Sequence, residues 1–264
     1  MLYCNSFMFS IFGPEWVIQN LEAVIFDKDG TIADIHPYWG EIIRRRAKAV
    51  IAHYRLSDSL FTPLCASMGL SLADNRLLPQ GPVGLASRDE VMQALRNCLT
   101  ALGVTTSADT IATLFTQVHQ AFLPEMDPYL QLIPGTGEFF ASLRRAGAKM
   151  AVVTSDTEVN TRQVLHKLGV GEYFTVIVGR DTTPEPKVSG VPARRALSEL
   201  GCREDRTVCV GDAPMDFFMA KQSGCLAGIG VATGQVQADE LNKYTPYVAL
   251  SMNDLKAKTL ADVN

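Results

Sequence analysis

The sequence predicts an α/β protein in which a doubly wound parallel sheet carries an inserted all-helical domain. Three observations lead to this fold class. An apolar run at residues 21–26 ends in two carboxylates, residues 34–130 show only helical periodicity, and helix and strand alternate from Pro134 onward. A parallel sheet with right-handed crossovers accounts for such alternation.

The opening strand is expected in the segment Leu21–Asp34, which reads LEAVIFDKDGTIAD. Its apolar residues run without helical spacing into Asp27 and Asp29, as in a strand that is buried on both faces. Ligands of open α/β sheets bind at the carboxyl ends of the strands. Gly30 lets the chain leave the strand in a conformation that other residues resist, and Thr31 can hold the turn. Considered alone, the motif also fits a plain polar turn.

The composition of the chain limits the classes of function that it can have. A chain of 264 residues with 47% hydrophobic residues can bury a full core. The formal net charge of -4 and the isoelectric point near 5.6 provide no general positive field for nucleic acid or an acidic membrane surface. The six cysteines show neither a CxxC pair nor a zinc spacing, so we expect small buried hydrophobes in a reducing cytoplasm.

Residues 1–20 are apolar enough to raise the question of export. No Lys or Arg precedes Lys28, no small-residue cleavage site follows, and Pro14 and Glu15 interrupt the apolar part. We therefore expect a packed or mobile leader without a transmembrane span, and a cytoplasmic protein.

The insertion is expected to be a separate helical domain over residues 34–130. Apolar residues spaced three and four apart predict helices at about 39–54, 88–102 and 111–122. Ser87 and Glu90 form a capping box at the start of the second helix. Residues 74–85 are rich in Pro and Gly and predict a loop.

The part of the chain from Pro134 onward, in which helix and strand alternate, is expected to complete the sheet. With the opening strand, it gives at least five strands. The expected helices are 137–146, 158–168, 191–200 and 215–224, and the expected strands are 149–154, 174–178, 207–210 and 226–229.

Polar residues follow further strands on the same edge as Asp27. Thr154 and Ser155 end the second strand, Asp212 and Asp216 follow the fourth, and a Pro-rich loop between them offers Lys187. A single loop Lys is usually solvated, and a single Thr after a strand is common. Four such features in order at carboxyl ends predict one site.

This arrangement resembles the haloacid dehalogenase superfamily of phosphohydrolases, and the resemblance covers nearly all residues from Leu21 onward. The matching motifs are DxDGT at Asp27 to Thr31, Thr154 after its apolar run, Lys187, and GDxxxD at Asp212 and Asp216. The resemblance implies a Rossmann-like core over residues 21–33 and 131–264, with residues 34–130 as a helical cap. Val188 follows Lys187 where the family usually has Pro, which leaves the geometry of that loop open.

The residues themselves suit phosphate ester chemistry, which needs a nucleophile, a cation and proton transfer. Asp27 can attack phosphorus and form an aspartyl phosphate. Magnesium suits the carboxylates of Asp27 and Asp212 and the backbone carbonyl of Asp29. The Asp29 side chain can protonate the leaving oxygen and later deprotonate water, a role that requires a raised pKa.

The remaining site residues are expected to bind and orient. Thr154 and amides near Ser155 would bind phosphoryl oxygens, and Lys187 would hold Asp27 against the phosphate. Asp216 would orient Lys187 or a metal-bound water.

Two residues of the insertion have more than one interpretation. By resemblance to related caps, Arg88 contacts the far end of the substrate; it is equally well an exposed residue in the first turn of a capped helix. His36 is either a substrate contact or a hinge or surface residue.

The expected function is a magnesium-dependent phosphatase that acts on a small phosphorylated metabolite, either phosphoglycolate or a sugar phosphate. In the resembling family, dehalogenases lack an acid two residues after the nucleophile, so Asp29 favours phosphate esters. A phosphomutase or phosphotransferase with the same motifs is an alternative, and a signalling receiver or non-hydrolytic binding module is another. GIGVATG at residues 228–234 lies after the last strand and predicts no dinucleotide site. The substrate and the oligomeric state are open at this point.

Overall fold

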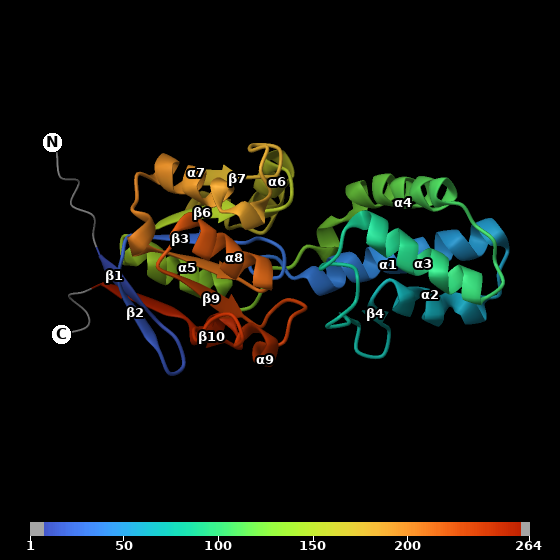
Figure 1. Cartoon of the computed structure of the whole chain (residues 1–264), viewed down its shortest axis with the longest axis horizontal. Coiled ribbons are helices and arrows are strands. Elements are labelled where there is room, and N and C mark those ends of the chain that lie inside the picture. The colour runs from blue at the N-terminus through green and yellow to red at the C-terminus, as the bar shows by residue number, and fades with distance from the viewer. Residues whose placement is uncertain (1–7, 260–264) are drawn as a thin grey trace. The chain divides into compact units, whose positions relative to one another are not determined.

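The computed structural model describes residues 8–259, which form two compact units. The first unit contains the chain up to Asp34 and again from Leu132 onward, and the second contains Ile35–Gln131. Figure 1 labels their helices and strands. We call them the core unit and the helical unit.

The core unit is built on a six-stranded sheet in the order β10-β9-β8-β3-β6-β7, and every pairing in it is parallel. Its strands are β3 (Ala23–Phe26), β6 (Lys149–Val153), β7 (Val176–Val178), β8 (Thr207–Gly211), β9 (Ala227–Val231) and β10 (Val248–Ala249). Phe26 pairs with Val152 of β6 on one side and with Val210 of β8 on the other. The predicted doubly wound parallel sheet is confirmed, and the residues after Phe26 emerge between two neighbouring strands.

Helices cover both faces of this sheet, which explains why the β3 sequence does not alternate between apolar and polar residues. The helices are α5 (Thr136–Arg145), α6 (Glu158–Lys167), α7 (Val191–Leu200), α8 (Pro214–Ser223) and the short α9 (Ala238–Leu241). Val24 and Phe26 pack in the cluster that includes α5 and α6 side chains. Ala23 and Ile25 pack on the opposite face with α7 and α8.

The segment 1–20, expected to be a packed or mobile leader, is packed into the core unit where the structure describes it, and residues 1–7 lie outside the described residues. The strands β1 (Phe9–Phe12) and β2 (Val17–Leu21) join β11 (Lys256–Thr259) in an antiparallel sheet of order β11-β1-β2. Ile11 and Leu21 are fully buried there. The apolar character of the segment therefore serves packing.

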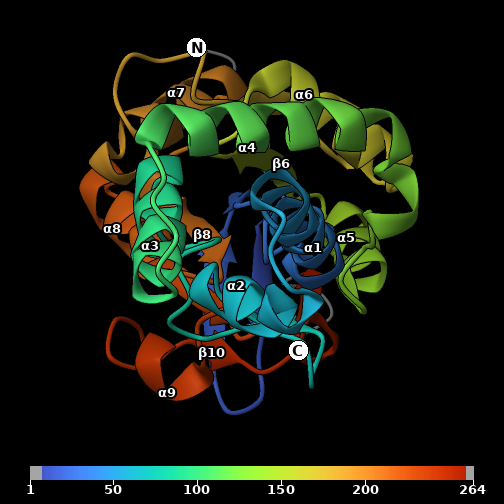
Figure 2. The ribbon, with the colours of Figure 1, turned by 90° about the vertical axis from the view of Figure 1, so that its right-hand side faces the viewer.

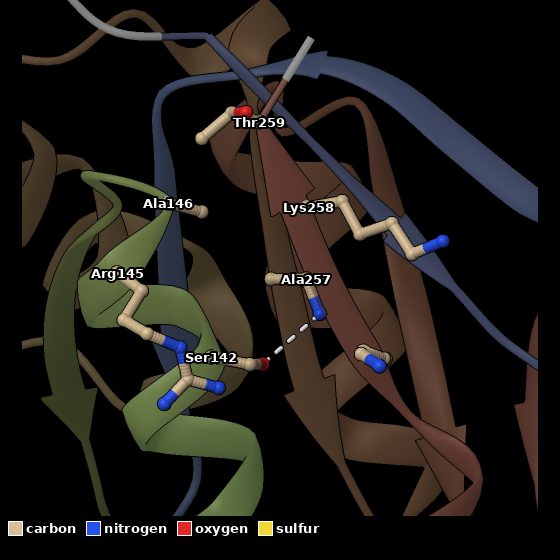
Figure 3. Close-up of a pocket in the computed structure, with 7 residues that line it drawn as sticks. Ser142, Arg145, Ala146, Ala257, Lys258 and Thr259 are labelled. Atoms are coloured by element: carbon tan, nitrogen blue, oxygen red, sulfur yellow. Dashed lines mark hydrogen bonds between the residues drawn. The ribbon is translucent and has the colours of Figure 1, made fainter. Parts of the chain in front are cut away.

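Figure 3 shows a hollow between α5 and β11, where Ser142 Oγ accepts a hydrogen bond of 3.0 Å from the backbone N–H of Ala257. Arg145, Lys256 and Lys258 also line it. None of the acidic residues that the sequence places in the site lies in this hollow.

The helical unit is a ring of four helices in which each helix contacts two others (Figure 2). They are α1 (Ile35–Tyr54), α2 (Phe61–Ser67), α3 (Arg88–Ala101) and α4 (Ala108–Phe122). Ser87 and Glu90 form the predicted capping box of α3. The strands β4 (Leu70–Ser71) and β5 (Arg76–Leu77) form a small hairpin, so part of the predicted loop is a strand.

Short 3-10 helices complete both units. They are η1 (Asp58–Leu60), η2 (Leu123–Glu125), η3 (Asp127–Tyr129), η4 (Gly171–Tyr173), η5 (Lys187–Ser189), η6 (Glu204–Arg206) and η7 (Met252–Asp254). Within residues 8–259, no helix combines the length and the apolar character that a membrane crossing requires.

The β1–β2 hairpin offers a direct test of its structural role. Ile11 is 0% exposed and Val17 is 42% exposed. We expect Ile11→Ala to lower the free energy of unfolding by about 2–5 kcal/mol, because it leaves a cavity in the core. Val17→Ala, the matched control, should change it by about 0.5 kcal/mol or less. Chemical denaturation measures both, and equal effects would contradict the packing described here.

Candidate active site

Asp27 stands where β3 leaves the sheet. Its backbone N–H still donates to the carbonyl oxygen of Val210 at 2.9 Å, which fixes it beside β8. The chain then turns through Gly30, whose φ of 87° lies in the region that favours glycine. The N–H of Gly30 donates to the carbonyl of Ala33 at 2.9 Å and closes the turn. The Asp27 side chain is thereby buried at the carboxyl edge of the sheet.

Lys187 reaches this edge from η5 and joins two of the predicted carboxylates. Its Nζ lies 2.5 Å from Asp27 Oδ1 and 2.6 Å from Asp216 Oδ1. Burial alone lowers the pKa of Lys187, but the charges of Asp216 and Asp27 more than offset burial and leave that pKa raised. Val188 lies within η5 and is 40% exposed, so the missing Pro does not keep Lys187 from the site.

Asp216 has both of its carboxylate oxygens engaged. Oδ1 pairs with Lys187, and Oδ2 accepts a hydrogen bond of 3.0 Å from the N–H of Ala213 at the start of α8. The side chain is 2% exposed. A carboxylate fixed in this way is suited to orienting Lys187, which is one of its two expected roles.

Asp212 is buried without a cationic partner among residues 8–259. Its Oδ1 accepts a hydrogen bond of 3.3 Å from Thr31 Oγ1. Two glycines approach the carboxylate so closely that a Cβ at Gly30 would lie 2.4 Å from Oδ2, and one at Gly234 would lie 1.7 Å from it. Thr233 Oγ1 donates to the carbonyl of Gly30 at 2.6 Å and ties these two loops together.

Sequence reasoning missed Thr233 and Gly234. They belong to the GIGVATG segment, which was considered only as a dinucleotide motif. The available signal was a Thr-Gly pair directly after a buried strand, at the same sheet edge as the acids.

The site fits a divalent cation. One oxygen each from Asp27, Asp212 and Asp216 lies within 4.8 Å of the others. Burial, followed by the charges of Asp27 and Asp216, raises the pKa of Asp212 well above its usual value. Burial also raises the pKa of Asp27, although Lys187 opposes that rise. Buried carboxylates with raised pKa values gain a counter-charge from a bound cation, and hard oxygen donors suit Mg²⁺.

Because Asp216 has a partner on each of its oxygens, the other oxygens at this sheet edge are the more available donors. Asp212 keeps one carboxylate oxygen that accepts no hydrogen bond from the described residues, and Asp27 keeps one that is not paired with Lys187. The backbone carbonyl of Asp29 likewise accepts no backbone hydrogen bond within residues 8–259. These three oxygens could hold the cation.

Thr154 lies at the same edge, because β6 is the direct neighbour of β3. The side chain is 3% exposed, and its Oγ1 accepts a hydrogen bond of 3.1 Å from the N–H of Asp156. Its hydroxyl hydrogen remains available to a ligand. Ser155 is exposed beside it.

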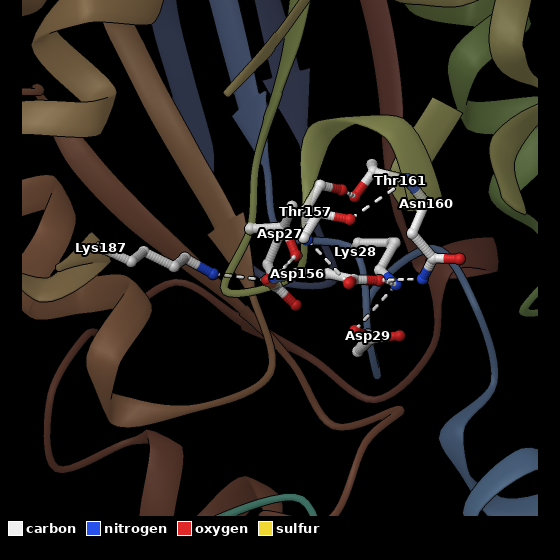
Figure 4. Close-up of polar contacts among 9 residues, drawn as sticks. Asp27, Lys28, Asp29, Asp156, Thr157, Asn160, Thr161 and Lys187 are labelled. Atoms are coloured by element: carbon white, nitrogen blue, oxygen red, sulfur yellow. Dashed lines mark hydrogen bonds and ion pairs between the residues drawn. The ribbon is translucent and has the colours of Figure 1, made fainter. Parts of the chain in front are cut away.

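Lys28 forms a second ion-pair cluster that sequence reasoning did not assign (Figure 4). Its Nζ lies 2.7 Å from Asp156 Oδ2 and 3.1 Å from Asp29 Oδ2. Partial removal from water raises the pKa of Asp29, and the charge of Lys28 opposes the rise. Because 46% of the Asp29 side chain remains exposed, we take this rise to be smaller than that of the buried Asp212.

Arg88 and His36 both belong to the helical unit. Arg88 Nη2 donates to the carbonyl of Ala112 at 3.1 Å and to Thr116 Oγ1 at 2.8 Å, both on α4. His36 is 4% exposed, and its Nδ1 accepts a hydrogen bond of 3.0 Å from the N–H of Leu77. Its burial argues against the surface role considered from the sequence.

Comparison with known proteins gives a consistent result. Residues 21–224 match the haloacid dehalogenase-like hydrolase family. The phosphoglycolate phosphatase of Neisseria meningitidis is 29% identical over 82% of this chain and 83% of its own length. The tyrosine-protein kinase PtkA of Mycobacterium bovis is 27% identical over 85% of this chain and 67% of its own length. The crystal structure of a predicted phosphoglycolate phosphatase from Haemophilus somnus is similar with a TM-score of 0.68 at 19% identity, over 89% of this chain and 96% of that one.

The raised pKa values of Asp27 and Asp212 predict how the effect of magnesium on thermal stability depends on pH. Without a cation, the folded chain binds more protons than the unfolded chain, so stability falls as the pH rises through those raised pKa values. Bound Mg²⁺ takes the place of these protons. We expect Mg²⁺ to raise the Tm by more at about pH 8 than at about pH 5. Thermal unfolding with and without Mg²⁺ measures this, and an equal rise in Tm at both pH values would contradict the prediction.

Gly234→Ala is the companion variant for that measurement. Because the new Cβ would collide with Asp212 Oδ2, we expect a smaller Mg²⁺-dependent shift. Gly137→Ala, the matched control in α5, meets no atom closer than 4.0 Å and should keep the full shift.

Proposed function

The chain belongs to the haloacid dehalogenase-like hydrolase family, and we propose that it is a magnesium-dependent phosphatase of a small organic phosphate monoester. The observation that carries the proposal is the Asp27 carboxylate, held 2.5 Å from Lys187 beside the uncompensated carboxylate of Asp212. A nucleophile, a fixed positive charge and a place for a cation thus meet at one sheet edge. The relative from Neisseria meningitidis, a phosphoglycolate phosphatase, supports this activity.

In the proposed first step, an Asp27 carboxylate oxygen forms a bond to phosphorus and the bond from phosphorus to the ester oxygen breaks. The Asp29 carboxyl gives its proton to the departing oxygen, which leaves as an alcohol. Thr154 and backbone amides near Ser155 donate hydrogen bonds to the phosphoryl oxygens. Lys187 keeps Asp27 in position while Asp216 orients Lys187.

In the second step, water attacks the phosphorus of the aspartyl phosphate. Asp29 takes a proton from that water, inorganic phosphate leaves, and the Asp27 carboxylate is restored. Mg²⁺, held by Asp27, Asp212 and the carbonyl of Asp29, would neutralise negative charge on the phosphoryl group. The exposure of Asp29, at 46%, suits a group that must meet both a leaving group and water.

We further assign the helical unit as a cap over residues 34–130 that determines specificity, with residues 21–33 and 131–264 as the catalytic core. Arg46 on α1 is 6% exposed and makes no ion pair with any described residue. Its guanidinium lies 3.9 Å from the ring centroid of Phe115, one residue before the Thr116 that Arg88 contacts. Two guanidinium groups therefore share one turn of α4.

A buried charge normally has a partner, and Arg46 lacks one within residues 8–259. Burial, and after it the charge of Arg88, lowers the pKa of Arg46. An anionic group on the substrate would supply the missing charge. This favours an ester that also carries a carboxylate, such as phosphoglycolate, over a neutral sugar phosphate.

A second candidate is phosphoryl transfer to a hydroxyl acceptor, as in a phosphotransferase or mutase. The similarity to a protein named as a tyrosine-protein kinase favours it, since a kinase transfers a phosphoryl group to a hydroxyl acceptor. Release of free phosphate distinguishes hydrolysis from transfer, which conserves the total ester.

Asp27→Asn tests the proposed nucleophile. We expect phosphate release from p-nitrophenyl phosphate with Mg²⁺ to fall by about 1,000-fold or more, because an amide cannot attack phosphorus effectively. EDTA should abolish the wild-type rate. Asp239→Asn, an exposed acid in α9, is the control and should keep full activity. An unchanged rate in Asp27→Asn would end the phosphatase hypothesis.

Arg46→Met and Arg88→Met test the substrate class. Each should raise the KM for phosphoglycolate by about tenfold, the effect of losing one charge-assisted contact, and leave the KM for p-nitrophenyl phosphate nearly unchanged. Lys48→Met on the exposed side of α1 is the control. Equal changes for both substrates would argue against an anion contact.

A further inference from the structure

We propose that Lys28 is a positioning residue that fixes the Asp29 carboxylate for proton transfer, and that Asp156 and Asn160 hold Lys28 in place. This inference rests on the proposed phosphatase function, because it assigns Asp29 the proton transfers. It concerns the residue between the two motif acids, which the motif leaves unspecified.

Lys28 is a buried ammonium with two carboxylate partners. The side chain is 5% exposed, and its Nζ lies 3.1 Å from Asp29 Oδ2 and 2.7 Å from Asp156 Oδ2. Figure 4 shows it pointing to the opposite side of Asp27 from Lys187. Each motif acid thus has its own lysine, since Lys187 contacts Asp27 and Lys28 contacts Asp29.

Asp156 is itself fixed to the first turn of α6. Its Oδ1 accepts a hydrogen bond of 2.7 Å from the N–H of Thr157, the N-cap residue of that helix. Its Oδ2 accepts a hydrogen bond of 2.5 Å from Asn160 Nδ2 in addition to the contact with Lys28. Because both oxygens are committed, Asp156 offers Lys28 one position only.

The contact with Asp29 goes beyond what burying Lys28 requires. Asp156 alone supplies a counter-charge for the ammonium. Asp29, by contrast, is 46% exposed and its carboxylate accepts no other side-chain hydrogen bond within residues 8–259, so Lys28 is what restrains it. A proton donor must stay within hydrogen-bond reach of the leaving oxygen, and small displacements of such a group lower the rate.

Dependence on the leaving group separates this role from a structural one. An alkyl ester needs protonation of its departing oxygen, whereas p-nitrophenolate is stable enough to leave with little help. If Asp29 is no longer held in position, the hydrolysis of alkyl esters should therefore slow selectively. A general disturbance of the site would slow both substrates alike.

The experiment measures kcat and KM for phosphoglycolate and p-nitrophenyl phosphate in the full chain with Mg²⁺. We expect Lys28→Met to lower kcat for phosphoglycolate by about 100-fold and kcat for p-nitrophenyl phosphate by about threefold or less. Asp156→Asn should show the same selectivity with a smaller loss, since it releases Lys28 without removing it. Lys221→Met, an exposed lysine of α8, is the control and should match wild type.

The variant Asp29→Asn distinguishes failure of the positioning role from failure of the proposed phosphatase function. Suppose that Asp29→Asn selectively loses activity on the alkyl ester. If Lys28→Met and Asp156→Asn then lose activity on both substrates equally, or on neither, the positioning role is wrong and the phosphatase mechanism stands. If the wild type hydrolyses neither substrate, the proposed function itself fails. Thermal unfolding of every variant confirms that the comparison is made on folded protein.

Discussion

The structure of the site depends on one electrostatic constraint, which is that three buried carboxylates lie together and a buried ammonium pairs with only two of them. Lys187 lies between Asp27 and Asp216 and compensates part of their charge. Asp212 lies close to both acids, and among residues 8–259 its side chain has only the hydrogen bond from the Thr31 hydroxyl. Bringing like charges together out of water raises the pKa of a carboxylate unless a cation neutralises it. A divalent cation would therefore bind more favourably at these buried carboxylates than at an exposed acid.

Close backbone packing maintains this constraint. Gly30 follows the first strand of the parallel sheet and Gly234 follows β9, yet both lie against the same carboxylate of Asp212. The hydrogen bond from Thr233 to the carbonyl of Gly30 joins the two loops. A Cβ at either glycine would collide with the Asp212 carboxylate and force it to shift. Small residues are thus as necessary to the site as the charged ones, because they set how closely the acids approach.

The sequence predicted those parts of the structure whose cause is local. The apolar run before Asp27 and the capping box at Ser87 each lie within a few residues, and Thr154 and Asp212 each directly follow their own apolar run. It did not predict the sheet of β1, β2 and β11, because those strands are short and β11 comes from the opposite end of the chain. Thr233 and Lys28 were missed for a related reason. An isolated Thr or Lys is usually solvated, and only the folded chain shows which distant carbonyl or carboxylate it contacts.

The different exposure of the two motif acids suits the different chemistry that we propose for them. Asp27 is buried and has Lys187 on one oxygen, which restrains its direction and suits the proposed nucleophile of an in-line attack. Asp29, two residues later, turns toward solvent and can exchange protons with water. A mobile acid would exchange protons equally well but would meet the leaving oxygen only part of the time. The contact between Lys28 and Asp29 resolves this conflict, since it restrains the carboxylate while leaving half of its surface accessible.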